Sequence, residues 1–305
     1  MAKDKRDMEG DGRAELDADD IVIRKRTQVV RKSVTRDDVL KAVGTMIGVV
    51  REKMHPLVQI FSDAASAPFA SSCVLCIGGR AISLDDTGEA TQASGFAEGL
   101  SASLGGFSKQ RQESIRAAVG QSVARARPWV LGVEGIADLS SRRFFAKELS
   151  RRFPGVIVAD AAEVAALAGE ERVDAEDENL EAVAIKAAAA IAAETHATVM
   201  LTGAVDTIVC EDRPVLVVKN GAPEIVAKVP GWAAAKASLV ATFLALLRNH
   251  KYAAAACASL IGGVAAEIAY SRCKTPQAFA AAYADTLATV TSAEIAKRAN
   301  IEIQN

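Results

Sequence analysis

Apolar residues in this chain follow two patterns, short buried runs and longer segments with helical spacing. The runs Leu57–Phe61, Pro128–Val133, Gly155–Ala159 and Ala197–Gly203 are almost wholly apolar, which is typical of strands that are buried on both faces. Segments with helical spacing, such as Lys109–Arg125, separate them. Because strands alternate with helices, the pattern predicts an α/β fold with a largely parallel central sheet and helices on both faces.

The stretch from Thr198 to Leu247 organises the predicted fold. The runs Asp206–Cys210 and Pro214–Val218 flank a short polar turn and predict a β-hairpin. Asn220-Gly221 predicts a type I′ turn, because both central residues of that turn need a positive φ. A last short strand is expected at Glu224–Val229.

A glycine turn and a helix follow this stretch of strands. Pro230, Gly231 and Trp232 precede the apolar helix predicted at Ala233–Leu247. The start of a helix after a glycine-containing turn is a common phosphate-binding site in α/β proteins, since free backbone N–H groups and the helix dipole both favour anions there. This turn is therefore the first candidate for a functional site.

The remaining segments complete the predicted element order. Helices are expected from Asp37-Asp38 to about Lys53, over Ala67–Ile77 with Gly78-Gly79 at its end, over Ser140–Arg152, from Asp160 through Leu167, and over Glu176–Glu194, Tyr252–Ser271 and Pro276–Val290. A strand near Leu100–Leu104 and a short C-terminal tail are also expected.

Length and composition set the class of the protein. Of the 305 residues, 50% are hydrophobic and only 5% are aromatic, and the net charge is -2, so neither a nucleic-acid surface nor an anionic membrane is an expected partner. Residues 1–36 are charge-dense and predict a flexible arm, in which Ile21–Ile23 could alternatively dock as a strand, and residues 37–305 predict a single domain. Without a signal peptide or an uncharged membrane-spanning run, we expect a soluble intracellular protein, cytoplasmic by default, with an organelle as the alternative.

Five cysteines lie in apolar segments, which favours reduced, buried thiols over a disulfide framework. Cys73 and Cys76 form a CxxC pair within a predicted helix. No second CxxC and no nearby histidine completes a metal site, so two buried helix cysteines are the preferred interpretation over a metal or redox role.

Several short motifs resemble those of one known family. They are Val50–Gln59 (VREKMHPLVQ), Leu167–Glu170 (LAGE), Leu201–Asp206 (LTGAVD), Val218–Pro223 (VKNGAP) and Ala265–Ala269 (AAEIA). In their order and spacing they resemble the hydroxyethylthiazole kinases of the ribokinase-like superfamily, over about Val39 to Val290. The resemblance implies an α/β homotrimer that phosphorylates 4-methyl-5-(2-hydroxyethyl)thiazole with Mg-ATP in thiamine salvage, with the substrate site between subunits.

The resemblance also points to departures at the site. Family members open the helix after the hairpin with Gly-Thr-Gly-Cys, an anion hole followed by a cysteine where relatives place a base. The matching positions here are Gly231, Trp232, Ala233 and Ala234. Ala234 cannot accept a proton, and the Trp232 indole is expected where a phosphate needs close backbone approach.

Other positions matched to the family differ in the same way. Val158 replaces the family's phosphate-binding arginine, and Glu134 lies two residues beyond the position of a lost aspartate. Asp160 and Glu163 could hold a hydrated Mg²⁺, or they could be only the N-cap and first-turn acid of one helix. On the nucleotide side, Thr202 and Gly203 match the family's Thr-Gly.

The thiazole side departs from the family as well. The family's Gly-Ala-Ser-Pro-x-Met corresponds to Gly78–Ser83, and two of its asparagines correspond to Asp63 and Ser72. A general base contributes about 10²–10⁴-fold to a rate and one oxyanion-type donor about 10²–10³-fold. These losses predict a pseudoenzyme that acts as a structural, assembly or regulatory component, with no cofactor, as a trimer or part of a larger assembly.

Two other functions remain open at this point. One is an active, ATP-dependent hydroxyethylthiazole kinase with rearranged site residues, which would need Mg-ATP. The other is a small-molecule binding module at a subunit interface, in which Trp232 and Arg80 contact the ligand.

Overall fold

A computed structural model describes residues 32–170 and 180–304, so the predictions for residues 1–31 and for the start of the helix at Glu176 lie outside the described part of the chain. Within that part, nine strands form one sheet in the order β2-β1-β3-β4-β5-β6-β7-β8-β9. The parallel strands are β1 (Leu57–Phe61), β2 (Arg80–Ile82), β3 (Gly99–Ser103), β4 (Trp129–Gly132), β5 (Val156–Ala159) and β6 (Thr198–Leu201). Antiparallel to their neighbours are β7 (Asp206–Val209), β8 (Val215–Val218) and β9 (Ile301–Gln304).

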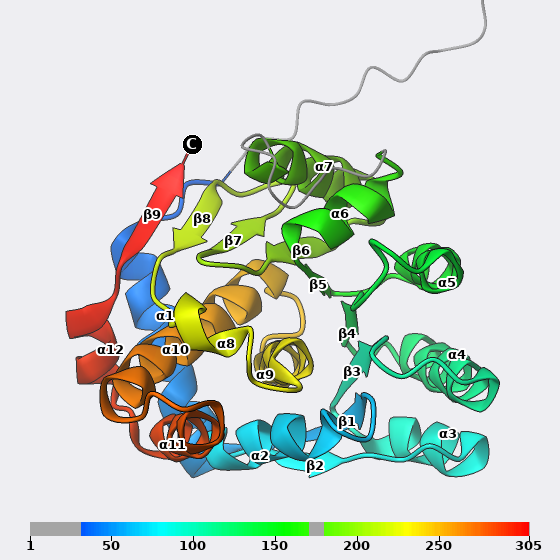
Figure 1. The fold of residues 1–305 in the computed structure, drawn as a ribbon, viewed down its shortest axis with the longest axis horizontal. Coiled ribbons are helices and arrows are strands. Elements are labelled where there is room, and N and C mark those ends of the chain that lie inside the picture. Colours follow the sequence, from blue (N-terminus) through cyan, green and yellow to red (C-terminus); the bar gives the residue numbers. More distant parts are fainter. Residues whose placement is uncertain (1–31, 171–179, 305) are drawn as a thin grey trace, which may run out of the picture. The chain divides into compact units, whose positions relative to one another are not determined.

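Helices cover both faces of this sheet (Figure 1). One layer holds α1 (Arg36–Gly48), α2 (Ala67–Ile77), α8 (Pro223–Val226), α9 (Trp232–Leu246), α10 (Lys251–Arg272), α11 (Pro276–Thr289) and α12 (Ser292–Arg298). The other holds α3 (Thr87–Phe96), α4 (Lys109–Ala124), α5 (Ser140–Ser150), α6 (Ala161–Ala168) and α7 (Leu180–Thr195). A π-helical turn, Val49–Lys53, extends α1. The predicted α/β class, with a largely parallel sheet and a β-hairpin, is confirmed.

Strand residues alternate between the two layers, as the period of a strand requires. In β5, Val156 and Val158 pack with α9 and α10, whereas Ile157 and Ala159 pack with the α3–α7 layer. All four are buried, which explains why the sequence of this strand is continuously apolar rather than alternating.

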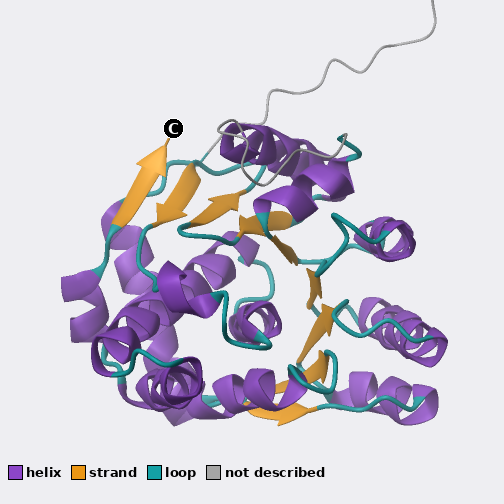
Figure 2. Ribbon diagram, in the orientation of Figure 1, coloured by secondary structure: helices purple, strands orange, loops and turns teal. Residues whose placement is uncertain are grey.

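α10 is long and apolar enough to cross a membrane by length and composition alone. However, 83% of its most apolar window is buried inside the fold, and Figure 2 shows it beneath the sheet beside α9. Burial in a core accounts for its composition, so α10 is a central packing helix.

The strand predicted at Glu224–Val229 is wrong. Pro223–Val226 forms the short helix α8, and β8 pairs instead with β9, which sequence analysis treated as a tail. Asn220 is buried: its Nδ2 donates to Glu267 Oε1 at 2.8 Å and to Arg298 O at 2.9 Å. It therefore links β8 to α10 and α12, and no hairpin turn forms there.

Candidate active site

A cavity of about 490 Å³ lies where several strands of the sheet end. Glu134, Asp160 and Thr202 follow β4, β5 and β6, and all three line it. The start of α9 forms the opposite wall, with Gly231, Trp232, Ala233 and Lys236. Ligands of open α/β sheets bind at the carboxyl ends of the strands, so this cavity is the candidate active site.

The turn before α9 is held in one conformation by close packing. Gly231 has φ of 80°, and a Cβ there would lie 2.8 Å from Ser66 Cα and 2.9 Å from Ser66 O. The first hydrogen bond of the helix runs from Ala235 N to Gly231 O at 2.8 Å. The amides of Ala233 and Ala234 thus precede the first helical donor, Ala235 N, and have no acceptor within the helix. Ala233 brings this anion-binding helix start to the cavity.

The Trp232 side chain packs in a cluster of aromatic residues from α2 and α11. Its ring stacks on Phe69 of α2 at a centroid distance of 6.3 Å and lies 4.7 Å from Tyr283 and 5.9 Å from Phe279 of α11. The indole is part of this aromatic cluster while also lining one wall of the cavity. The ring is held by α2 and α11, and that it takes the place of an anion stays a prediction.

Two acidic side chains converge over a glycine beside the cavity. A Cβ on Gly105 would lie 2.5 Å from Glu134 Oε2 and 2.8 Å from Asp63 Oδ2. Burial raises the pKa of Glu134, and the negative charge of Asp63 raises it further. A carboxylate with a raised pKa is a stronger proton acceptor than an ordinary exposed one.

Asp160 and Glu163 form a capping box at the start of α6, which confirms their predicted capping role. Asp160 Oδ1 accepts from Glu163 N at 2.8 Å, and Glu163 Oε2 accepts from Asp160 N at 2.9 Å. Glu163 Oε1 also accepts from Gly135 N at 2.7 Å, which ties α6 to the loop after β4. Burial and the neighbouring Asp160 carboxylate raise the pKa of Glu163 to about 7.

The fit of these residues to Mg-ATP can be judged from their donors. Over residues 32–170 and 180–304, no group of three His, Cys, Asp or Glu side chains is placed to hold a metal ion. Mg²⁺ commonly keeps several waters and uses only one or two carboxylates together with substrate phosphates. Asp160 lines the cavity and supplies one such carboxylate, so the site meets that requirement.

Thr202 and Gly203 separate two cavities. Besides the candidate active site, they line a cavity of about 330 Å³ that extends toward Ala161, Leu180 and Glu181. Thr202 N donates to Ala159 O at 2.8 Å, which fixes the turn at the end of β6. Two adjoining cavities at a strand end suit an elongated ligand with a polar and a less polar part.

Sequence analysis missed Lys236. It is the only charged residue of α9, an otherwise uncharged helix, and that single Lys in an apolar segment was the available signal. By contrast, Ala234 is fully buried and lies outside the lining of the cavity, so it contributes only packing and its amide.

Several other predicted residues lie elsewhere. Arg80 donates from Nε to His55 O at 2.9 Å and lines a separate cavity with Lys53 and Glu98, so it shares no cavity with Trp232. Cys73 and Cys76 both lie on α2, as predicted, but only Cys73 is buried, whereas Cys76 is half-buried.

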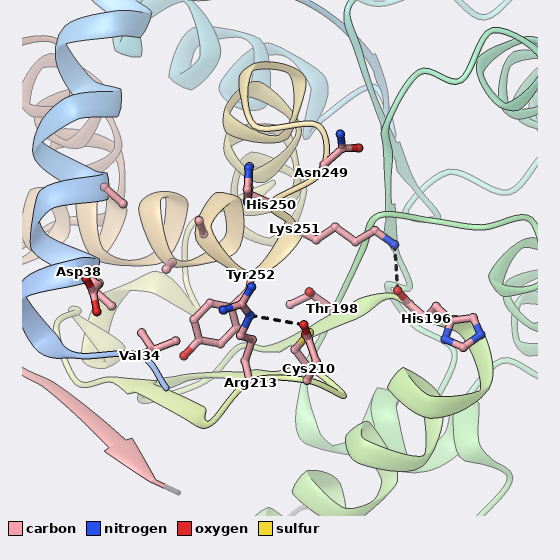
Figure 3. A pocket seen from close by; sticks show the side chains of 15 residues that line it. Val34, Asp38, His196, Thr198, Cys210, Arg213, Asn249, His250, Lys251 and Tyr252 are labelled. Atoms are coloured by element: carbon pink, nitrogen blue, oxygen red, sulfur yellow. Dashed lines mark hydrogen bonds and ion pairs between the residues drawn. The ribbon is translucent and has the colours of Figure 1, made fainter. Parts of the chain in front are cut away.

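Another cavity, of about 380 Å³, lies at the amino end of β6 (Figure 3). Thr198, Cys210, Arg213 and Tyr252 line it, and Lys251 Nζ donates to His196 O at 2.9 Å across its rim. Tyr252 Oη is buried and has no hydrogen-bond partner among the described residues. This cavity lies at the amino end of β6, whereas the acidic residues Glu134 and Asp160 follow the carboxyl ends of β4 and β5.

Comparison with known proteins identifies the family. The sequence model described as HK: Hydroxyethylthiazole kinase family matches residues 49–293. The chain belongs to the hydroxyethylthiazole kinase family. A hydroxyethylthiazole kinase of Cronobacter sakazakii is 32% identical over 236 residues, which cover 76% of this chain and 87% of the relative. One from Corynebacterium efficiens is 30% identical over 259 residues, which cover 82% and 94%.

Solved structures show the same fold. A hydroxyethylthiazole kinase structure from Pyrococcus horikoshii OT3 aligns with a TM-score of 0.79 at 24% identity, covering 87% of this chain and 100% of that chain. A pyridoxal kinase from Staphylococcus aureus aligns with a TM-score of 0.59 at 12% identity, covering 82% and 98%. The ribokinase-like fold predicted from the motifs is thus confirmed.

Family membership corrects the functional prediction from sequence. The pseudoenzyme and its expected lack of catalysis are contradicted, because relatives at about 30% identity over most of the chain are named hydroxyethylthiazole kinases. The expectation of no cofactor is not supported either, since a kinase family implies a requirement for Mg-ATP. The predicted loss of catalysis rested on each missing motif residue separately and took no account of the other residues around the cavity.

Proposed function

We propose that this protein is an ATP-dependent hydroxyethylthiazole kinase, acting in thiamine salvage. Membership of the family supports the reaction, and one observation of the site carries it to this chain. The start of α9, with Gly231 and Ala233, lines the same cavity as Glu134 and Asp160, and the Trp232 ring beside it is held in the aromatic cluster.

Each part of the reaction has a candidate group. The α9 amides bind phosphate oxygens, and the adjoining cavity beyond Thr202 and Gly203 takes the nucleoside. Asp160 would hold a hydrated Mg²⁺, which would offset negative charge on the phosphates. Gly231 keeps the helix start against Ser66, so the amides are fixed before the substrate arrives.

The chemical step needs a proton acceptor, and Ala234 cannot provide one. Glu134 is the candidate, because it lines the cavity and its pKa is raised by burial. The hydroxyl oxygen of the thiazole forms a bond to the γ-phosphorus as the bond from phosphorus to the bridging oxygen breaks. ADP leaves with that oxygen, and Glu134 takes the hydroxyl proton.

An assay of the full-length chain tests this proposal. The purified protein is incubated with Mg-ATP and 4-methyl-5-(2-hydroxyethyl)thiazole, and the phosphorylated thiazole is measured by mass spectrometry alongside ADP. We expect thiazole-dependent ADP formation with matching product. ADP formation without phosphorylated thiazole, or transfer to pyridoxal offered in parallel but not to the thiazole, would contradict the assignment.

The oligomeric state is a separate proposal. A homotrimer is expected from the family resemblance, and light scattering on the purified chain measures it directly. A monomer that remains fully active in the same buffer would contradict a site shared between subunits.

A further inference from the structure

Lys236 occupies an unusual position for a charged residue. It follows Trp232 by one helical turn on α9, a helix whose other residues carry no charge, and its side chain is only 13% exposed. That side chain lines the candidate active site, where Glu134 and Asp160 contribute negative charge. Among the described residues lining this cavity, Lys236 is the sole cation.

The ammonium group of Lys236 is held in place by a buried carboxylate. Lys236 Nζ donates to Asp206 Oδ1, and Asp206, at the start of β7, is only 3% exposed. The other oxygen of that carboxylate, Oδ2, accepts from Ser259 Oγ of α10 at 2.7 Å. An ammonium group carries three N–H donors, so the bond to Asp206 leaves donors that can face the cavity.

A contribution to folding stability is not a sufficient explanation for the Lys236–Asp206 ion pair. A buried ion pair adds little net stability, because the cost of desolvating both charges offsets their attraction, and apolar residues would fill the same space. A cavity that receives a polyphosphate beside two carboxylates, in contrast, needs positive charge. Lys236 supplies it close to the α9 amides, and Asp206 keeps it from turning away.

We infer that Lys236 binds the terminal phosphate of ATP, with Asp206 as its positioning residue. The inference rests on the proposed kinase function and names the group that contacts the transferred phosphate. Lys236 then remains on the phosphoryl group as negative charge shifts toward ADP, and the proton of the accepting hydroxyl goes elsewhere, to Glu134.

Isothermal titration of the full chain with nucleotide tests the inference without relying on turnover. Mg-ATP and Mg-ADP are titrated separately, with no thiazole present, into wild type, Lys236→Gln, Lys236→Arg and Ser259→Ala. Loss of one charge-assisted hydrogen bond weakens binding by about 10- to 100-fold, so we expect that loss for ATP in Lys236→Gln. ADP affinity should change less than about threefold, because ADP lacks the terminal phosphate.

The other variants act as matched controls. Lys236→Arg retains the charge and should bind ATP more tightly than Lys236→Gln. Ser259→Ala removes the second partner of Asp206 without touching the cavity, so it should weaken ATP binding less than Lys236→Gln does and leave ADP affinity unchanged. If Lys236→Gln does not fold, the double variant Lys236→Gln with Asp206→Asn removes both charges and is titrated in its place.

Three outcomes overturn the inference. They are ATP binding by Lys236→Gln equal to wild type, an equal loss for ATP and ADP, and a wild-type chain that binds neither nucleotide. A wild-type chain that binds ATP in a Lys236-dependent way but phosphorylates no thiazole supports the inference and contradicts only the proposed function.

Discussion

The ring centroids of Trp232 and Tyr283 lie 4.7 Å apart, which joins the first residue of α9 to α11. A bulky residue at the start of a phosphate-binding helix is compatible with anion binding when its side chain has a firm alternative contact. Here Phe69, Phe279 and Tyr283 supply that contact. The helix start can therefore keep its amides free although three of the four family residues are absent from it.

Replacing Trp232 tests this relationship. Trp232→Ala should lower the free energy of unfolding by about 2–3 kcal/mol, somewhat less than for a fully buried aromatic residue, because the ring is half-buried. ATP affinity should not rise. Urea denaturation and nucleotide titration measure the two effects. Phe144→Ala, at a side chain that is 75% exposed, is the control and should change stability by less than about 0.5 kcal/mol. Tighter ATP binding by Trp232→Ala would show that the indole obstructs the phosphates.

Gly231 permits a second test of the helix start. Gly231→Ala combines a positive φ of 80° with contacts of 2.8 and 2.9 Å to the Ser66 backbone, so we expect a loss of about 1–3 kcal/mol and a fall in kcat/KM. Gly120→Ala is the matched control. A Cβ there meets nothing within 4 Å in the middle of α4, and the substitution should stabilise the protein by about 0.4–1 kcal/mol. Full activity of Gly231→Ala would show that the turn need not be fixed.

The proposed role of Glu134 predicts a change in the pH profile. If Glu134 accepts the hydroxyl proton, Glu134→Gln should reduce kcat by about 10²–10⁴-fold and remove the acidic limb of the kcat profile. In wild type that limb should lie above the ordinary carboxyl range, because burial raises the pKa of Glu134. Rate measurements from pH 5 to 9 give the profile. A variant that is slower by less than about tenfold, with an unchanged limb, would assign proton transfer to another group.

Glu163 predicts a pH dependence of stability. Its pKa is raised from 4.5 to about 7 by burial and by the Asp160 carboxylate. A carboxyl group with a raised folded-state pKa contributes stability that is complete below its unfolded pKa and is lost as the pH rises through the folded value. Between about pH 4.5 and 7, wild type should therefore lose stability relative to Glu163→Gln, by at most about 1.4 kcal/mol per pH unit.

Urea denaturation of both proteins at pH 5, 6, 7 and 8 measures this difference. Glu163→Gln should be less stable than wild type at pH 5, because Gln presents only one acceptor to the amides of Gly135 and Asp160. The gap should narrow as the pH rises. A gap that stays constant over the range would mean that Glu163 titrates as an ordinary exposed carboxyl group.

Most of the fold could be predicted because its strands and helices carry strong local patterns. β5 is continuously apolar, and α11 begins at Pro276, where a proline suits the first turn of a helix. The region after β8 could not be predicted locally. Asn220-Gly221 matches a hairpin signal, yet the Asn220 side chain is committed to Glu267, Arg298 and Asn300. These partners are distant in the chain, and no window around Asn220 contains them.

The candidate active site could likewise be predicted only in part. The motif comparison located the start of α9 and the capping pair Asp160 and Glu163, because their positions follow directly from strand ends. It could not reveal that the Trp232 ring packs with α11, nor that Lys236 reaches the cavity. Both facts depend on how α9 packs against α11 and β7. A lost side chain in a motif therefore says little until the groups that surround its position in space are known.

The pairing of β9 with β8 also has a consequence for biosynthesis. β8 is apolar throughout, and its free edge is covered by residues that the ribosome adds only after α8 through α12 have been synthesised. During that interval the nascent chain carries an open strand edge, the kind of surface on which unwanted intermolecular pairing starts. Residues Ile301–Gln304 thus form the edge strand that completes the sheet. A chain shortened before these residues should depend far more on chaperones to reach its native state.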